Sequence, residues 1–377
     1  MGPTRTDPVQ RQQRRLWSPV RMAAADSYWI VLIVTLALTV IITRVSLELT
    51  GYPQVGDATY HVAHVLWGGL AMFIALVLPL TFANPYIPWV TAILGGIGSG
   101  LFIDEVGKFI TQRNDYFFPL AFPIIYSFIL VCVWFALRLR AFRRPDARSQ
   151  LYNVLDDVKQ VLDNDLDPHE HAELRNRLTH VLRETDDAEE RALAEALLGF
   201  CQSRAVRLAE NPTVLQQTWH RGRALAFRIP PRPIVRGILV ISFGYTALNS
   251  VVQLVTFAGL VWSGGRTALR QALGQSVIVS GKAAYVVDNP ILSAVQASAI
   301  IVAGLLALGA AALLLGGRDR AGLRFGTASL AISLLLVNLL SFYFNQLYAL
   351  LATLGETALL LLAMLYRWRF LRHYTRS

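Results

Sequence analysis

The chain contains eight long stretches of apolar residues, and this feature limits the folds open to it more than any other. A helix that crosses a hydrocarbon core of about 30 Å needs roughly 20 consecutive apolar residues. The sequence therefore predicts an all-α, polytopic integral membrane protein with about eight transmembrane helices. We place them at residues 28–48, 59–83, 88–111, 117–138, 235–262, 290–316, 325–345 and 348–367.

The distribution of charge orients the predicted helices. Only 16% of the residues are charged, against about 25% in ordinary soluble domains, which argues against a soluble enzyme. The net charge is +10, and arginines are concentrated in both terminal segments, after the fourth apolar stretch and between the sixth and seventh. Because positively charged segments remain in the cytoplasm, we expect a multi-pass protein of the plasma (inner) membrane with both termini cytoplasmic. The basic excess thus reflects orientation and does not indicate nucleic-acid binding.

The composition also divides the chain into segments. We expect a basic cytoplasmic tail over 1–27, transmembrane helices one to four over 28–138, a cytoplasmic helical domain over 139–233, helices five to eight over 234–370 with an outer loop at about 263–289, and a short tail over 371–377.

The insert at 149–233 differs from the rest of the chain because its acidic residues outnumber its basic ones. Its apolar residues recur at helical spacing, which predicts three or four helices, the last from Pro212 to Phe227. An acidic helical segment does not suit nucleic acid, whose binding needs a basic face. A role in docking a cytoplasmic protein partner or in dimerisation suits this segment better, while the apolar helices are expected to contact the lipid bilayer.

Ionisable residues inside the predicted helices are concentrated at one level. Such residues are costly in a membrane and usually face a bundle interior or a water-filled cavity. The alternating direction of the first three helices brings these residues to the outer leaflet. They are Arg44 and Glu48 in the first helix, His61 and His64 in the second, and Asp104, Glu105 and Lys108 in the third.

Several chemistries fit this polar cluster. One hypothesis is a divalent-metal site with His61, His64, Asp104 and Glu105 as ligands, since imidazole and carboxylate groups suit Zn²⁺ or a di-iron-type cation. In a catalytic site, these four residues and Lys108 are the candidates for the reacting groups. Whether the protein is an enzyme stays open.

Three other interpretations of the cluster remain. Arg44 and Lys108 can bind an anionic, lipid-like substrate while a histidine acts as general base. The cluster can also relay protons or ions during transport. Finally, it can be structural, with ion pairs four residues apart, Arg44 with Glu48 and Asp104 with Lys108, closed within single helices.

The second half of the chain supports a different function, transport through helices five to eight. Ser242, Tyr245, Asn249 and Gln253 form one polar stripe, and Glu356 is an ionisable residue within the last predicted helix. A conduit lined by such residues would use Glu356 as an ion or substrate site. A membrane scaffold that docks its partner through the cytoplasmic domain is the third alternative.

Two segments of the first half, HVAHVLWGG and GLFIDEVGKFITQRNDYFFP, are similar to segments of other proteins. Together they resemble segments of uncharacterised bacterial polytopic membrane proteins, over roughly the second to the fourth predicted helix. The resemblance implies a bacterial membrane fold and no particular activity.

Overall fold

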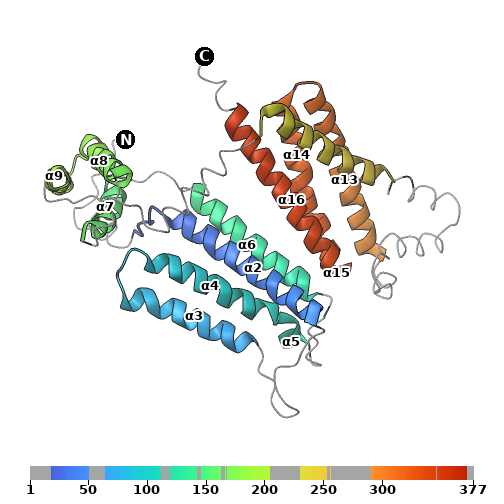
Figure 1. The fold of residues 1–377 in the computed structure, drawn as a ribbon, viewed down its shortest axis with the longest axis horizontal. Helices are drawn as coiled ribbons and strands as arrows, with labels where there is room; N and C mark the ends of the chain where they lie inside the picture. Colours follow the sequence, from blue (N-terminus) through green and yellow to red (C-terminus); the bar gives the residue numbers. More distant parts are fainter. Residues whose placement is uncertain are drawn as a thin grey trace, which may run out of the picture. The chain divides into compact units, whose positions relative to one another are not determined.

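The protein is all-α within the residues that the structure describes (Figure 1). The computed structural model describes residues 18–50, 64–111, 118, 120–141, 146–162, 166, 168–203, 230–252, 255, 290–344 and 346–371. In this part of the chain, eight helices are long and apolar enough to cross a membrane. The prediction of an all-α polytopic membrane protein is confirmed.

The eight helices follow the predicted apolar stretches closely. They are Ala25–Leu47, His64–Thr81, Ile87–Asp104, Ala121–Leu139, Arg232–Val252, Ala294–Leu315, Asp319–Tyr343 and Tyr348–Leu371. The seventh begins six residues before its predicted start at residue 325, because only Gly316–Arg318 separates it from the preceding helix. Gly317 has a φ of 78° in this turn, a conformation that favours glycine.

The chain divides into two compact units. The first unit comprises Met1–Asp104 and Val131–Ala226, and the second comprises Glu105–Leu130 and Phe227–Ser377. The division therefore passes between two adjacent acidic residues of the predicted cluster, Asp104 and Glu105.

In the first unit, α4 (Ile87–Asp104) packs against both α2 (Ala25–Thr50) and α3 (His64–Thr81). The end of α6 (Ala121–Ala141) also contacts α2, where the rings of Trp29 and Phe135 lie 5.0 Å apart. Figure 1 shows α2, α3 and α4 side by side. Many of their large apolar side chains are exposed, as expected where lipid is the solvent.

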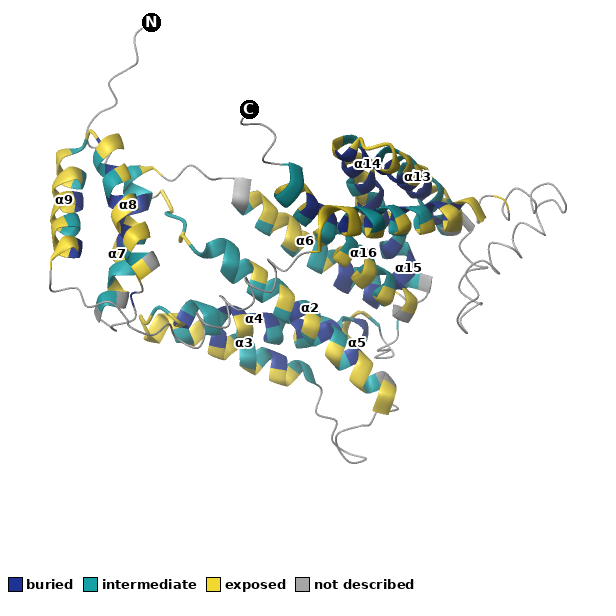
Figure 2. Cartoon of the chain, turned by 45° about the horizontal axis from the view of Figure 1, so that its top comes forward, coloured by how far each residue is buried: buried dark blue, intermediate teal, exposed yellow. Residues whose placement is uncertain are grey.

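The predicted insert forms three described helices within the first unit: α7 (Ala147–Leu162), α8 (Pro168–Glu184) and α9 (Ala188–Gln202). Their apolar faces share a core that includes Val154, Leu178 and Ala194 (Figure 2). The Asp187 side chain caps α9 by accepting a hydrogen bond from the backbone N–H of Glu189. The fourth predicted helix, 212–227, lies outside the described residues.

The second unit is built from the helix over Arg232–Val252, α13 (Pro290–Leu315), α14 (Asp319–Ile332), α15 (Asn338–Phe344) and α16 (Gln346–Tyr366). A π-helical segment, η1 (Ser333–Val337), joins α14 to α15, and a second, η2 (Arg367–Leu371), follows α16. Phe243 packs into the space left by Gly326, where a Cβ atom would overlap its ring. The start of α6 belongs to this unit, and Phe122 and Tyr126 pack against Phe342.

The third predicted membrane helix is shorter than expected. The sequence predicted one helix over 88–111, whereas α4 ends at Asp104 and a short helix, α5 (Val106–Ile110), follows. Glu105 precedes α5 with a φ of −82° and a ψ of 2°, which interrupts the α-helix. The single helix predicted over 88–111 is therefore divided at Glu105.

Candidate functional site

Three helices of the first unit meet at the Asp104 carboxylate. Arg44 on α2 donates from Nε to Asp104 Oδ1 at 2.5 Å, and from a second guanidinium nitrogen to the Asp104 carbonyl oxygen at 2.9 Å. His64, the first residue of α3, places Nε2 3.2 Å from Asp104 Oδ2. We call Arg44, Asp104 and His64 the triad.

The three side chains of the triad differ in how far they are exposed. The Asp104 side chain is 0% exposed and the Arg44 side chain 8%, whereas 24% of the His64 side chain is exposed. The carboxylate is thus enclosed, and the imidazole is the member of the triad that solvent or a solute can reach.

Close helix packing brings the triad together. Gly68 on α3 and Gly98 on α4 face each other, and a Cβ atom on Gly98 would lie 2.7 Å from the Gly68 carbonyl oxygen. On the other side of α4, a Cβ atom on Gly100 would lie 2.9 Å from the Leu36 carbonyl oxygen of α2. Glycines on both sides let the backbones approach closely enough for the side chains at the helix ends to meet.

The remaining members of the predicted cluster are not part of the triad. Glu105 and Lys108 belong to the second unit, where Lys108 Nζ lies 3.0 Å from Glu105 Oε2. Glu105 is nearly fully buried. His61 lies outside the described residues, and so does the side chain of Glu48.

The metal hypothesis gains no support from the described residues. Within them, no group of three or more His, Cys, Asp or Glu side chains is placed to hold a metal ion. Both oxygens of Asp104 contact other side chains, and one of these is a guanidinium that repels a cation. Since His61 is not described, the four-residue metal site remains a prediction.

A separate polar site lies within the second unit at Glu356 of α16. Ser333 donates to Glu356 Oε1 at 2.5 Å, and Asn338 donates to Oε2 at 2.8 Å. Ser333 is 6% exposed and Asn338 2% exposed. The sequence identified Glu356 and pointed to Asn338 as a polar residue of the seventh membrane helix. It did not predict that Ser333 and Asn338 both donate to Glu356, because their position depends on η1 between α14 and α15.

The structure describes part of the polar stripe predicted for the fifth membrane helix. Tyr245 and Asn249 are exposed, Ser242 is half-buried, and Gln253 lies outside the described residues. A buried polar residue of this helix is Ser250, which donates to a backbone carbonyl oxygen of α13 at 3.0 Å. A conduit lined by the stripe remains a prediction.

A charge cluster around the buried Asp319 was not predicted. Arg232 donates to Asp319 Oδ2 at 2.6 Å, and the Tyr366 hydroxyl donates to the same oxygen at 2.6 Å. Arg236 also binds the Leu314 carbonyl oxygen at the end of α13. From the sequence, the arginines of GGRDRAGLR indicated only the orientation of the chain in the membrane. The isolated acidic residue among the arginines of GGRDRAGLR was the signal that could have identified the cluster.

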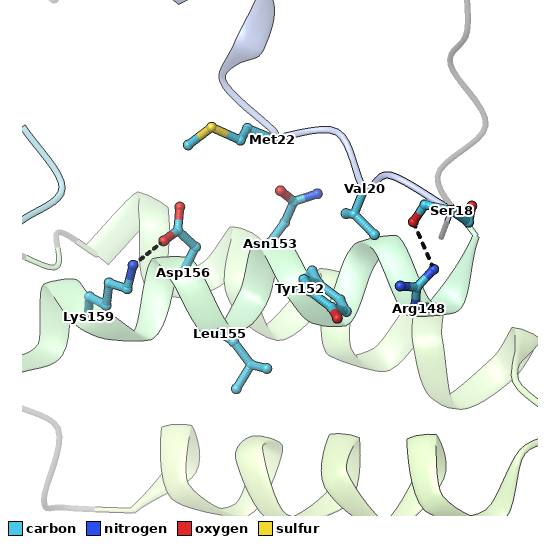
Figure 3. A pocket seen from close by; sticks show the side chains of 9 residues that line it. All are labelled: Ser18, Val20, Met22, Arg148, Tyr152, Asn153, Leu155, Asp156 and Lys159. Carbon is cyan, nitrogen blue, oxygen red and sulfur yellow. Dashed lines mark hydrogen bonds and ion pairs between the residues drawn. The ribbon is translucent and has the colours of Figure 1, made fainter. Parts of the chain in front are cut away.

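An open groove borders the predicted partner-binding domain. It holds about 510 Å³ and lies between residues 18–22 and the outer face of α7, where Arg148 donates to the Ser18 carbonyl oxygen at 3.3 Å (Figure 3). Tyr152 and Leu155 are exposed along it. A protein partner for residues 149–233 remains a prediction.

Comparison with protein-family models, with curated proteins and with solved structures finds no match to this chain. The fold nevertheless defines its class: it is a multi-pass integral membrane protein, and its apolar helices contact the lipid bilayer.

Proposed function

We propose that this membrane protein binds and releases protons at the triad, as the proton-binding step of a coupled transport process. The observation that supports this function most is the Asp104 carboxylate, which is held by Arg44 on one oxygen and by His64 on the other. Each member of the triad then has a distinct part in proton exchange.

His64 is the group that exchanges the proton. Histidine is the side chain whose ordinary titration range lies closest to physiological pH. With Nε2 directed at the Asp104 carboxylate, the hydrogen bond is formed by the tautomer protonated at Nε2, and in that tautomer the incoming proton adds to Nδ1.

Arg44 and Asp104 act by position and charge. Arginine remains protonated throughout the accessible pH range, so Arg44 keeps a donor on the carboxylate in both states of His64. Because Asp104 is enclosed between the two side chains, its charge acts through a medium of low dielectric constant.

The other hypotheses for the cluster are less well supported by this geometry. A divalent cation would have to displace Arg44 from Asp104, and an anionic lipid-like substrate would have to compete with Asp104 for Arg44. Binding of a proton by His64 leaves the contact between Arg44 and Asp104 in place.

The distribution of arginines supports the orientation that we propose. With both termini and α7–α9 in the cytoplasm of a bacterial cell, the triad lies at the outer face of the plasma membrane. Protons would then enter or leave His64 from the outside.

The test compares His64→Gln with His180→Gln in proteoliposomes that contain a pH-sensitive dye. Glutamine can still donate a hydrogen bond to Asp104 but does not titrate, and His180 is an exposed histidine of α8 that serves as the matched control. A potassium diffusion potential drives proton movement, with and without each member of a panel of small solutes.

We expect wild-type protein and His180→Gln to carry protons in at least one condition, and His64→Gln to carry them about tenfold more slowly or worse. Equal rates for His64→Gln and wild type would contradict the proposal. Wild-type rates equal to those of empty vesicles in every condition would also contradict it.

A further inference from the structure

The second unit holds a carboxyl group whose environment differs from that of the other membrane-embedded acids. Among the spanning helices whose side chains are described, Asp26, Asp104 and Asp319 each contact an arginine: Arg21, Arg44 and Arg232, respectively. The recorded contacts of Glu356 come instead from the neutral donors Ser333 and Asn338.

The π-helical segment explains how both donors reach Glu356. In an α-helix, residues five apart point about 140° away from each other around the axis. Here the Asn338 backbone N–H bonds the Ser333 carbonyl oxygen, a five-residue step that brings the two positions toward one face of the helix. Ser333 and Asn338 can therefore contact the two oxygens of one carboxyl group.

A third helix supports the π-helical segment. The Tyr126 hydroxyl of α6 donates to the Leu334 carbonyl oxygen at 2.7 Å. A π-helical turn disturbs the regular ladder of backbone hydrogen bonds, and an added donor on one of its carbonyl oxygens offsets part of that cost. Such turns occur frequently at functional sites.

The partners of Glu356 can accommodate both of its protonation states. The Ser333 hydroxyl can donate to a carboxylate and can equally accept from a protonated carboxyl group. The Asn338 amide offers both a donor and an acceptor. An arginine partner, by contrast, only donates and so fixes the anion, as at Asp104 and Asp319.

From this geometry we infer that Glu356 is a second proton-binding site, loaded as the neutral acid and held by Ser333 and Asn338. The site lies in a different unit from the triad and uses different side chains, so it does not depend on the proposed function. On binding, the proton adds to a carboxylate oxygen of Glu356, and on release the same O–H bond breaks.

The test uses dicyclohexylcarbodiimide, an apolar reagent that partitions into membranes and reacts with protonated carboxyl groups. The acid transfers its proton to a carbodiimide nitrogen, and the carboxylate oxygen bonds to the central carbon. Rearrangement to the N-acylurea leaves the whole reagent attached. Mass spectrometry of the digested protein then locates the adduct.

In the full-length protein in lipid vesicles, we expect the adduct on Glu356 and about tenfold less on Asp104 and Asp319, which are the internal controls. Labelling of Glu356 should decrease from about pH 6 to about pH 9, because the protonated fraction falls about tenfold for each pH unit above the midpoint. Glu356→Gln should remove this adduct and leave the rest of the labelling pattern unchanged.

Two results would overturn the inference. One is the absence of an adduct on Glu356 in wild-type protein at every pH, and the other is labelling of Glu356 that does not decrease as the pH rises. Both are measured on the wild-type protein, so neither depends on whether the variant folds. The triad can fail its own test while Glu356 is labelled, and the reverse also holds.

Discussion

Arg44 and Asp104 lie 60 residues apart in the chain, yet Arg44 Nε donates to Asp104 Oδ1 at 2.5 Å and both side chains are buried. The pair joins α2 to α4, so it connects helices, whereas the structural interpretation of the sequence placed both charges in pairs within single helices. We therefore expect this ion pair to stabilise the packing of α2 against α4 in the first unit.

Removing one partner of this pair should destabilise the protein strongly. Arg44→Gln leaves Asp104 enclosed without its cation, and Asp104→Asn leaves Arg44 without its anion. Each change should cost about 3–5 kcal/mol, because a buried charge without its counterion is expensive. The double variant should recover a substantial part of that loss. Thermal unfolding in detergent, followed by size-exclusion chromatography, measures the effect. Additive losses in the double variant would show that the two side chains act independently.

Two adjacent glycines should respond differently to alanine. A Cβ atom on Gly68 would lie 2.9 Å from the Gly98 carbonyl oxygen, whereas a Cβ atom on Gly69 would meet nothing within 4 Å. Gly68→Ala should therefore push α3 away from α4 and destabilise the protein by about 1–3 kcal/mol. Gly69→Ala should be neutral or stabilising by up to about 1 kcal/mol, because alanine favours the helix. Unfolding midpoints of the two variants provide the comparison, and equal shifts would contradict the close packing at Gly68.

The cluster at Asp319 should contribute to the stability of the second unit. Asp319→Asn removes the negative charge that Arg232 and Tyr366 share. We expect a loss of about 1.5–3 kcal/mol, the range for hydrogen bonds to charged groups. Arg320→Gln, at the neighbouring exposed position, is the matched control and should change stability little. A midpoint for Asp319→Asn equal to that of Arg320→Gln would mean that the cluster does not stabilise the fold.

The helical domain should lose stability as the pH rises from about 4 to about 6. Burial raises the pKa of Asp157 from 3.8 to about 6, and the nearby Arg177 offsets only part of this effect. A raised pKa means that the folded state binds the proton more tightly than the unfolded state does. The stabilisation is therefore fully present below the unfolded value and lost as the pH passes through the folded value.

The expected loss is about 1 kcal/mol or less, because a third of the Asp157 side chain is exposed and solvent screens its charge. Hydrogen exchange of the α7 and α8 peptides, corrected for intrinsic rates, measures the change. Asp157→Asn should flatten the pH dependence, whereas Asp156→Asn, at a more exposed neighbouring position, should preserve it. Identical pH profiles for the two variants would contradict this assignment.

The sequence by itself determined the class of fold and the positions of the eight membrane helices. Membrane insertion depends on the summed hydrophobicity of about 20 consecutive residues, which is a local property of the chain. The three described helices of the insert were predictable for the same reason, since their apolar spacing is local. Glu356 and the Asp104 region could be identified because an ionisable residue within an apolar stretch is visible in the sequence.

Only the tertiary structure decided which side chains meet. The pairing of Asp104 with Arg44 depends on the close approach of α2 and α4, which the glycines of α4 allow. The Asp319 cluster joins residues from three distant segments. The contact of Ser333 and Asn338 with Glu356 depends on the five-residue hydrogen bond of η1. Each of these arises from side-chain packing between helices or from a local change in backbone geometry. Neither the packing of side chains between helices nor the local change in backbone geometry can be derived from hydropathy and charge spacing along the chain.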